Sequence, residues 1–449
     1  MRSVLPTGPI LFIPGCFTLH ILIDIAMAKP ILTSSSLISV EHIYQAKVRL
    51  KGVADITPML FNFRFSEQYD CSVWFKREDM QVVRSYKIRG AYNNMATMTA
   101  DQLQNGVVCA SAGNHAQGVA FACQKMQVHG KIFMPIVTPK QKVNKVKLFG
   151  KNFVEVVLTG DTFDDANTEA QRCAEEEGRG YVHPFNDPGT IAGQGTVGVE
   201  ILDSATGPID YIFVPVGGGG LSAGIGSYVK QISPQTKIIG VEPAGATAMY
   251  ESLQAGELVT LENIDAFVDG AAVRKVGENT FNIAQTVLDD ICLVQEGKIC
   301  STILQLYNEE GLVVEPAGAL TIAVLDQYAE VIKGKNVVCV VSGGNNDITR
   351  TEEIKERALL YEGLKHYFII RFPQRAGALR DFLNNVLGPD DDITHFEYTK
   401  KHNRESGPAM VGIQVKQRED YQKLLHRMEQ HQIDFQTLND SKMLFDLLI

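Results

Sequence analysis

Short apolar runs that recur along the chain restrict its fold more than any other feature of the sequence. Between about residues 37 and 350, these runs alternate with longer stretches of helical periodicity. The runs are rich in Val, Ile and Phe and occupy residues 106–110, 131–135, 153–157, 211–215, 237–241 and 336–341. Strands that are apolar on both sides are typical of a parallel sheet covered by helices on both faces. The sequence therefore predicts an α/β fold, with helices over 112–126 and 220–231 that begin directly after glycine-containing turns.

A different alternation follows residue 350. Residues 351–365 are charged and helical in pattern, which predicts a connector. The segments after it predict a strand over 367–372, a helix over 376–387, two strands over 393–398 and 409–415, and a helix over 418–431. A short final strand follows. This βαββαβ order is the ferredoxin-like pattern. We therefore expect one large α/β domain over 29–350 and a smaller ferredoxin-like domain over 366–449.

Composition excludes several classes of protein. A chain of 449 residues, 45% apolar and 21% charged, is typical of a globular protein with two or three domains. Its formal net charge of -10 argues against a nucleic-acid partner and gives no support for docking on a membrane. Eight scattered cysteines include no CxxC pair, which favours a reducing, cytoplasmic location over a disulfide framework.

The first 28 residues differ from the rest. The stretch over 10–26 is mostly apolar, but Pro14 and Asp24 interrupt it and it is short for a membrane-spanning helix. Its end, Ala26-Met27-Ala28, imitates a small-residue cleavage site, so a secretory signal remains an alternative. We expect residues 1–28 to be a disordered extension without a functional role.

A lysine beside apolar residues is the first candidate for chemistry. Lys87 lies in the segment Ser85–Gly90 (SYKIRG), where a helix begins. An amine near apolar groups loses part of its charge stabilisation, which favours the neutral nucleophile that forms a Schiff base with a carbonyl. A solvated helix lysine is the alternative for this segment taken alone.

The second candidate segment is SAGNHAQG, over residues 111–118. It follows a strand and opens a helix, so its free amides and small hydroxyl suit a substrate carboxylate. The candidate substrate contacts are Ser111, Ala112, Gly113, Asn114 and His115. Asn114 is also a candidate donor to a cofactor oxygen, whereas the ring of His115 fits a structural hydrogen bond better than a catalytic base. A capped turn without function is the alternative.

Two further turns follow apolar strands. Gly217, Gly218, Gly219, Gly220 and Leu221 form a glycine-rich turn that suits a phosphate. A dinucleotide fold is its rival, but the G-x-G-x-x-G spacing is imperfect and Glu242 is a weak candidate for the ribose-binding acid. Ser342 begins the turn SGGNN after another strand, at the edge where α/β proteins bind ligands. Its hydroxyl is a candidate partner for a pyridine nitrogen, unless it merely caps its own turn.

In this order and at these intervals, the four segments resemble the fold-type II (tryptophan synthase β-like) pyridoxal-phosphate enzymes, and more narrowly the threonine dehydratases. The resemblance covers about residues 37 to 449, with Tyr86 standing where the group often has Phe. It implies pyridoxal 5'-phosphate as the cofactor, with Lys87 as the Schiff-base lysine and Asn114 at the phenolic oxygen. It also implies that Gly217–Leu221 bind the phosphate and that Ser342 faces the ring nitrogen.

The resemblance implies deamination of L-threonine, and also of L-serine. The freed amine of Lys87 would remove the Cα proton. A hydroxyl from Ser342 does not hold the ring nitrogen protonated, which favours expulsion of the β-hydroxyl over a long-lived carbanion. The products would be 2-oxobutanoate and ammonia. Some relatives bind a cation through acids after a similar strand, but Ala248 stands where a second acid is wanted, so we predict no metal site.

The segment over residues 372–379 (FPQRAGAL) resembles the ACT-like regulatory domain of the biosynthetic enzymes. That resemblance implies a step in isoleucine biosynthesis, feedback inhibition by isoleucine with valine as a second candidate modulator, and a homo-oligomer, either a tetramer or a dimer. Three rivals stay open: an amino-acid racemase, threonine synthase and a non-enzymatic amino-acid sensor.

Overall fold

Residues 37–398 and 405–439 are described by a computed structural model. The extension that we predicted over 1–28 lies outside these ranges. None of the helices within them is long and apolar enough to cross a membrane. The strands form three sheets, two in the larger N-terminal part of the chain and one in the C-terminal part.

The largest sheet has six strands in the order β1-β2-β10-β7-β8-β9, and all neighbours are parallel except β1 and β2. The strands are β1 (Met59–Phe61), β2 (Ser72–Arg77), β7 (Tyr211–Pro215), β8 (Lys237–Pro243), β9 (Asp290–Val294) and β10 (Asn336–Val341). Successive side chains of β10 enter two different cores, with Val337, Cys339 and Val341 in one and Val338 and Val340 in the other. Its continuous apolar run therefore reflects burial on both faces.

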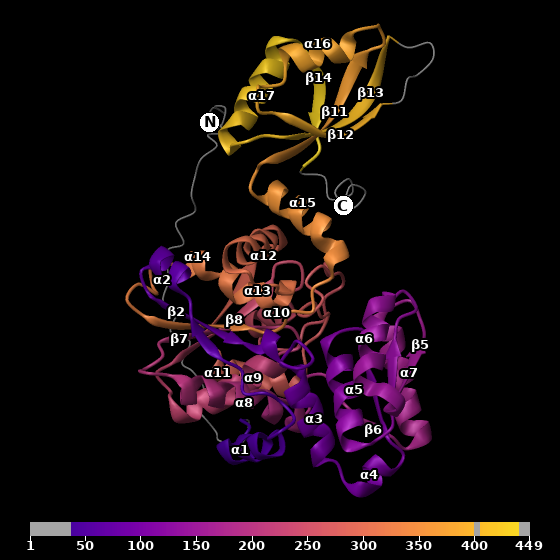
Figure 1. Ribbon diagram of the computed structural model, residues 1–449, viewed down its shortest axis with the longest axis vertical. Coiled ribbons are helices and arrows are strands. Elements are labelled where there is room, and N and C mark those ends of the chain that lie inside the picture. Colours follow the sequence, from indigo (N-terminus) through magenta and orange to yellow (C-terminus); the bar gives the residue numbers. More distant parts are fainter. Residues whose placement is uncertain (1–36, 399–404, 440–449) are drawn as a thin grey trace, which may run out of the picture. The chain divides into compact units, whose positions relative to one another are not determined.

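Helices cover both faces of this sheet (Figure 1). One face packs against α2 (Phe63–Tyr69), α12 (Glu296–Glu310), α13 (Pro316–Ala323), α14 (Leu325–Tyr328) and α15 (Thr351–Tyr361). The other packs against α1 (Val40–Arg49), α8 (Pro188–Ser204), α9 (Gly220–Ile232), α10 (Ala248–Ala255) and α11 (Glu278–Val287). Ile354 and Ala358 of α15 are buried in the first core, so the helix predicted within the connector packs against the large domain.

The second sheet is parallel throughout, in the order β5-β4-β3-β6. Its strands are β3 (Val107–Ala110), β4 (Gly130–Met134), β5 (Val154–Leu158) and β6 (Gly180–Tyr181). One face carries α3 (Lys87–Thr97), α5 (Asn114–Met126) and α6 (Lys140–Gly150), and the other carries α7 (Phe163–Glu177). The remaining short elements are α4 (Ala100–Gln104), η1 (Glu78–Met80), η2 (Lys151–Phe153) and η3 (Ile348–Arg350).

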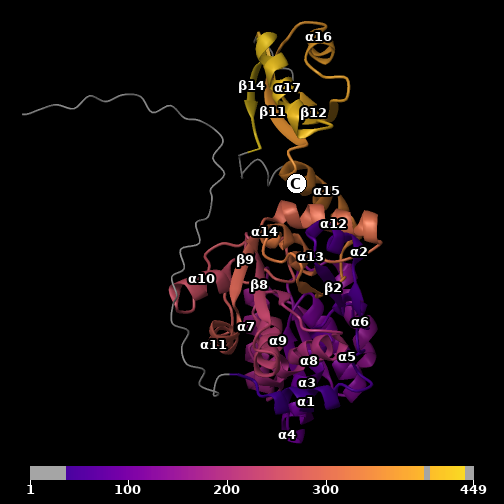
Figure 2. The same ribbon diagram turned by 90° about the vertical axis from the view of Figure 1, so that its left-hand side faces the viewer.

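The C-terminal sheet is antiparallel, in the order β12-β13-β11-β14. Figure 2 shows this part of the chain, with α16 and α17 drawn beside its strands. Along the chain the elements are β11 (Lys365–Pro373), α16 (Ala378–Asn385), β12 (Asp392–Tyr398), β13 (Ser406–Gln414), α17 (Arg418–Gln430) and β14 (Asp434–Thr437). Phe382 of α16 and Leu424 of α17 share one core with Phe368 and Val411 of the strands, so both helices cover the same face. The predicted βαββαβ order is confirmed.

The predicted fold class is confirmed as well. Each predicted strand of the large domain lies within two residues of an observed one at either end. Four strands were missed: β1, β2, β6 and β9. In β2, Lys76 and Arg77 follow the apolar residues and obscure the strand pattern, although β2 lies between β1 and β10 inside the sheet, while β6 has only two residues.

Candidate active site

The candidate site lies at the carboxyl ends of strands from both parallel sheets. The turns after β3, β7 and β10 are Ser111–Gly113, Val216–Gly219 and Ser342–Asn346. Two hydrogen bonds tie the turn after β10 to the residue before Lys87 and to the start of α5: Tyr86 N donates to Ser342 O at 3.1 Å, and Asn345 Nδ2 donates to Asn114 Oδ1 at 2.7 Å. The edge where several such turns meet is the ligand-binding edge of α/β sheets.

Lys87 is the first residue of α3. Its side chain keeps some solvent exposure, but protein atoms surround its amine, and this burial lowers the pKa of Lys87 from 10.5 to about 8. The nearby carboxylate of Glu315 offsets part of that effect. At pH 7.5 about a quarter of such amines are neutral, against about one in a thousand at the ordinary pKa. Nζ donates to Pro184 O at 3.0 Å, so the amine is held in place.

Asn114 is fixed by a buried carboxylate that the sequence analysis missed. Its Nδ2 donates to both carboxylate oxygens of Glu315, at 2.7 and 3.0 Å. Burial raises the pKa of Glu315 to about 7. A donation from Asn114 to a cofactor oxygen would replace one of these two bonds. Glu315 immediately precedes α13. A single glutamate before a proline is not a recognisable motif, so the sequence gives no sign of its role.

The glycine-rich turn presents backbone amides at the start of α9. Gly219 has φ +87° and is the N-cap residue, and no side chain caps the helix. Its first amides are therefore free to bind an anion. A Cβ atom on Gly218 would lie 2.3 Å from the ring of Phe185, and one on Gly219 would lie 2.6 Å from Met249 Cε. At Gly218 and Gly219, the turn therefore has no room for a larger side chain without a shift of its neighbours.

Ser342 follows β10 directly and is 2% exposed. Besides the bond between its carbonyl and Tyr86 N, Ser85 pairs with Gly343 in an isolated bridge. The turn after β10 is therefore tied to the two residues that precede Lys87. Ser85 Oγ is buried and has no hydrogen-bond partner among the described residues.

The turn before α5 leaves space beside Gly113. Gly113 is its N-cap residue, and a Cβ atom there would meet nothing within 4 Å. Ser111 Oγ accepts a hydrogen bond from Gly113 N at 3.2 Å. The first two residues of the predicted helix, Ala112 and Gly113, belong to this turn. His115 differs: its buried ring contacts Val182 O at 2.8 Å, and burial lowers its pKa to about 3. Only its backbone amide remains a candidate substrate contact.

A second feature that the sequence analysis missed is the segment after β6, over residues 182–186. It supplies the carbonyl oxygens that meet His115 and Lys87, and the ring of Phe185 that crowds Gly218. His183 Nδ1 accepts hydrogen bonds from Phe185 N and Asn186 N, which shapes the turn. These contacts join residues far apart in the sequence, and no local motif signals them.

Glu242 does not act as a free ligand in this structure. Its buried carboxylate accepts hydrogen bonds from Met249 N and Tyr250 N at 2.9 and 2.8 Å, at the start of α10. Burial raises the pKa of Glu242 to about 8. Within the described ranges, no group of three or more His, Cys, Asp or Glu side chains is placed to hold a metal ion.

Comparison with known proteins assigns this arrangement to a family. A family model described as a pyridoxal-phosphate-dependent enzyme matches residues 51–343, and one described as the C-terminal regulatory domain of threonine dehydratase matches 356–448. The chain is 58% identical over 421 residues to the biosynthetic L-threonine dehydratase IlvA of Bacillus subtilis (strain 168), which covers 94% of this chain and all of that protein. This chain belongs to the biosynthetic threonine dehydratase family.

Other members of this family and of its fold support the assignment. The biosynthetic L-threonine dehydratase IlvA of Staphylococcus aureus (strain NCTC 8325 / PS 47) is 51% identical over 422 residues, covering 93% of this chain and all of that one. The solved structure of processed threonine deaminase isoform 2 from Solanum lycopersicum matches with a TM-score of 0.67 and 42% identity, over 72% of this chain and 95% of that chain. Maize serine racemase matches with the same TM-score and 29% identity, over 73% and 99%.

Threonine dehydratases depend on pyridoxal phosphate, and the residues present fit this cofactor. Lys87 offers an amine of lowered pKa to an aldehyde. The uncapped α9, preceded by glycines where side chains would collide, offers free amides to a phosphate.

Proposed function

We propose that the protein converts L-threonine into 2-oxobutanoate and ammonia, with pyridoxal phosphate attached to Lys87, and that it also deaminates L-serine. The observation that carries this proposal is the buried amine of Lys87, together with the uncapped starts of α5 and α9 at the carboxyl ends of strands from the two parallel sheets. The 58% identity to a biosynthetic L-threonine dehydratase supports the choice of substrate.

Each residue has a distinct part in the proposed reaction. The bound cofactor withdraws electrons from the substrate Cα when it is present. Lys87 holds the cofactor between turnovers, and its freed amine takes the Cα proton, for which a pKa near 8 is well suited. The free backbone amides that begin α5, at Asn114 and His115, bind the substrate carboxylate. Ser342 offers a neutral hydroxyl to the ring nitrogen, which favours loss of the β-hydroxyl group.

The products formed from L-threonine separate this function from its rivals. Trapping with a hydrazine should detect a keto acid in stoichiometric amounts with ammonia. Recovery of threonine only as its epimer would identify a racemase instead, and turnover of a phosphorylated substrate alone would identify a threonine synthase. Binding of an amino acid without any turnover would leave only a sensor.

Capture of the cofactor should depend on pH in a way that reports the pKa of Lys87. Only the neutral amine attacks an aldehyde, so the rate at which cofactor-free protein takes up pyridoxal phosphate should rise with pH and level off above about pH 8. Stopped-flow absorbance between pH 6 and 10.5 measures this rate. A rate that keeps rising to pH 10 would mean that the amine has the ordinary pKa of a solvated lysine.

We also infer that the C-terminal domain binds isoleucine and thereby inhibits the enzyme, with valine as a second modulator. This inference rests on the match of residues 356–448 to the C-terminal regulatory domain of threonine dehydratase. The βαββαβ domain has its own core, which is separate from the cores around the two parallel sheets. Such a module pairs readily through its sheet edges or helices, so we further propose a cytoplasmic homo-oligomer, a tetramer or a dimer.

Removal of the regulatory domain should abolish inhibition while activity persists. A chain that ends at Gly363 retains α15, whose Ile354 and Ala358 fill the core against the six-stranded sheet. We expect it to make 2-oxobutanoate at a rate within about threefold of the full chain and to be insensitive to isoleucine. A full-length Leu424→Asp variant, which disrupts only the regulatory core, is the matched control and should also lose inhibition. Isoleucine inhibition that survives both changes would place the effector site elsewhere.

A further inference from the structure

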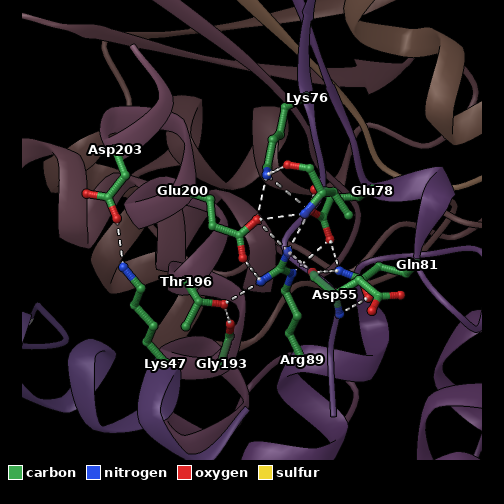
Figure 3. Close-up of polar contacts among 11 residues, drawn as sticks. Lys47, Asp55, Lys76, Glu78, Gln81, Arg89, Gly193, Thr196, Glu200 and Asp203 are labelled. Atoms are coloured by element: carbon green, nitrogen blue, oxygen red, sulfur yellow. Dashed lines mark hydrogen bonds and ion pairs between the residues drawn. The ribbon is translucent and has the colours of Figure 1, made fainter. Parts of the chain in front are cut away.

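Four buried charged side chains form a cluster beneath the start of α3 (Figure 3). The cations are Lys76 of β2 and Arg89 of α3, and the anions are Glu78 of η1 and Glu200 of α8. Their exposed fractions are 0, 2, 0 and 6%, respectively. Two positive and two negative charges leave the cluster neutral, as burial at this depth requires.

Arg89 is the centre of this cluster. Its Nε and Nη2 each donate at 2.8 Å to a different oxygen of Glu78, and its Nη1 and Nη2 donate to the two oxygens of Glu200 at 2.6 and 2.9 Å. Nη1 also donates to Thr196 Oγ1 at 3.1 Å. The planar guanidinium thus forms paired hydrogen bonds with two carboxylates at once, whereas a lysine ammonium lacks the planar, forked arrangement of donors that this geometry needs.

Lys76 completes the cluster from the six-stranded sheet. Its Nζ donates to Glu200 at 2.5 Å and to Thr57 O at 2.6 Å. Thr57 Oγ1 in turn donates to Glu78 at 2.5 Å. Lys76 pairs in register with Val340, two residues before Ser342. The cluster therefore links α3 to the strand that borders β10.

Helices α3 and α8, which the hydrogen bonds of Arg89 connect, approach each other closely. A Cβ atom on Gly90 would lie 2.2 Å from Gln194 Nε2, and one on Gly193 would lie 2.5 Å from Arg89 O. These glycines let α3 and α8 come near enough for the guanidinium to reach Glu200. Gly90 and Arg89 belong to the same SYKIRG segment as Lys87, but the proposed reaction uses neither.

We propose that Arg89 is a positioning residue for the Lys87 amine, an inference that rests on the proposed role of Lys87. Arg89 lies two residues after Lys87, and a helix turns by about 200° over that interval. The two side chains therefore leave the first turn of α3 on opposite sides. Glu78 and Glu200 hold one side of this turn through Arg89, and the other side presents the amine to the site. Arg89 acts without contacting the substrate.

Stability alone does not account for such a cluster. The free energy lost when charges are removed from water can exceed the free energy gained from their attraction, so apolar side chains of similar volume often stabilise such a contact as well or better. The guanidinium of Arg89 has five N–H donors in a rigid plane, and these donors fix its orientation between the two carboxylates. The consequence is geometric, because misplacing a reacting group by about 1 Å costs on the order of 100-fold in rate.

An Arg89→Lys holoenzyme tests the proposal, with Ile201→Ala as its matched control. Arg89→Lys keeps the charge but loses the fork. Ile201 is fully buried in α8, next to Glu200, and its truncation destabilises the same helix without touching a charge. For Arg89→Lys we expect kcat per folded molecule to fall roughly 10- to 100-fold, KM for L-threonine to stay within about threefold, and the visible circular dichroism of the bound cofactor to change. For Ile201→Ala we expect a lower Tm with kcat and circular dichroism unchanged.

The outcomes separate this inference from the proposed function. Wild-type protein that makes no keto acid contradicts the proposed function, whatever Arg89 does. Active wild type with an Arg89→Lys variant that loses only Tm, as Ile201→Ala does, overturns the positioning role. If Arg89→Lys does not fold, the charge-balanced double variant Glu78→Gln with Arg89→Met replaces it, and the same loss of kcat is expected. Failure of both variants to fold would show a purely structural cluster and would also overturn the proposal.

Discussion

Replacing Lys87 with alanine should lower kcat/KM for L-threonine by at least about 1000-fold, because one side chain serves both as the cofactor's anchor and as the base. The substitution also removes the amine whose pKa burial has lowered to about 8. Loss of a buried amine relieves its desolvation, so Tm should hardly fall. The protein should also lose the visible absorbance band of lysine-bound pyridoxal phosphate. Keto-acid formation and an absorbance spectrum measure both effects.

Lys237→Ala is the matched control for this experiment. Lys237 is an exposed lysine at the amino end of β8, whereas the candidate site lies at the carboxyl ends of the strands. Its loss should leave kcat/KM and the absorbance band unchanged. A Lys87→Ala protein that keeps the band and more than about a tenth of the activity would show that another lysine carries the cofactor.

Replacing Gly219 with alanine should weaken pyridoxal phosphate binding by roughly 10- to 100-fold, which corresponds to about 1.4 to 2.8 kcal/mol. Two effects add at this position. An L side chain is strained at φ +87°, and its Cβ atom would lie 2.6 Å from Met249 Cε and 2.9 Å from Thr280 Cβ. Relief of either strain shifts the amides that begin α9. Titration of cofactor-free protein, followed by tryptophan fluorescence or absorbance, gives the Kd.

Gly256→Ala isolates the backbone part of this effect. Gly256 has φ +74°, but its Cβ atom would meet nothing within 4 Å, and it follows α10 rather than the site. It should cost stability while leaving the Kd for the cofactor unchanged. Equal cofactor affinity in the two variants would mean that the glycine-rich turn does not hold the phosphate.

Local patterns predict most of the large domain because strands such as β3, β7 and β10 are buried on both faces. The side chains of residues 337–341 in β10 alternate between two cores, so all five are apolar and form one continuous run in the sequence. The same logic fails for β2, where Lys76 is fully buried yet charged. Its burial depends on Glu200, which lies 124 residues away, and no local pattern contains that partner.

The residues of the candidate site also fall into two groups, those that local motifs predict and those that only the folded structure reveals. Lys87, Asn114 and the glycine-rich turn lie in short segments whose residue types already suggest their chemistry. Contacts that involve residues far apart in the sequence hold these segments at the carboxyl ends of strands from the two parallel sheets. Glu315 and Phe185 were missed because their importance comes only from what they touch. The ring of His115 faces Val182 O, an orientation that the sequence alone does not determine.

Reductive trapping tests the central claim most directly. Sodium borohydride fixes pyridoxal phosphate to the lysine that holds it, and mass spectrometry of the digested protein then locates the modified residue. We predict a single pyridoxyl group, on the peptide that contains Lys87, and its disappearance when excess L-threonine is present before reduction. A pyridoxyl group on another lysine, or none in a protein that still makes 2-oxobutanoate, would contradict the proposed site.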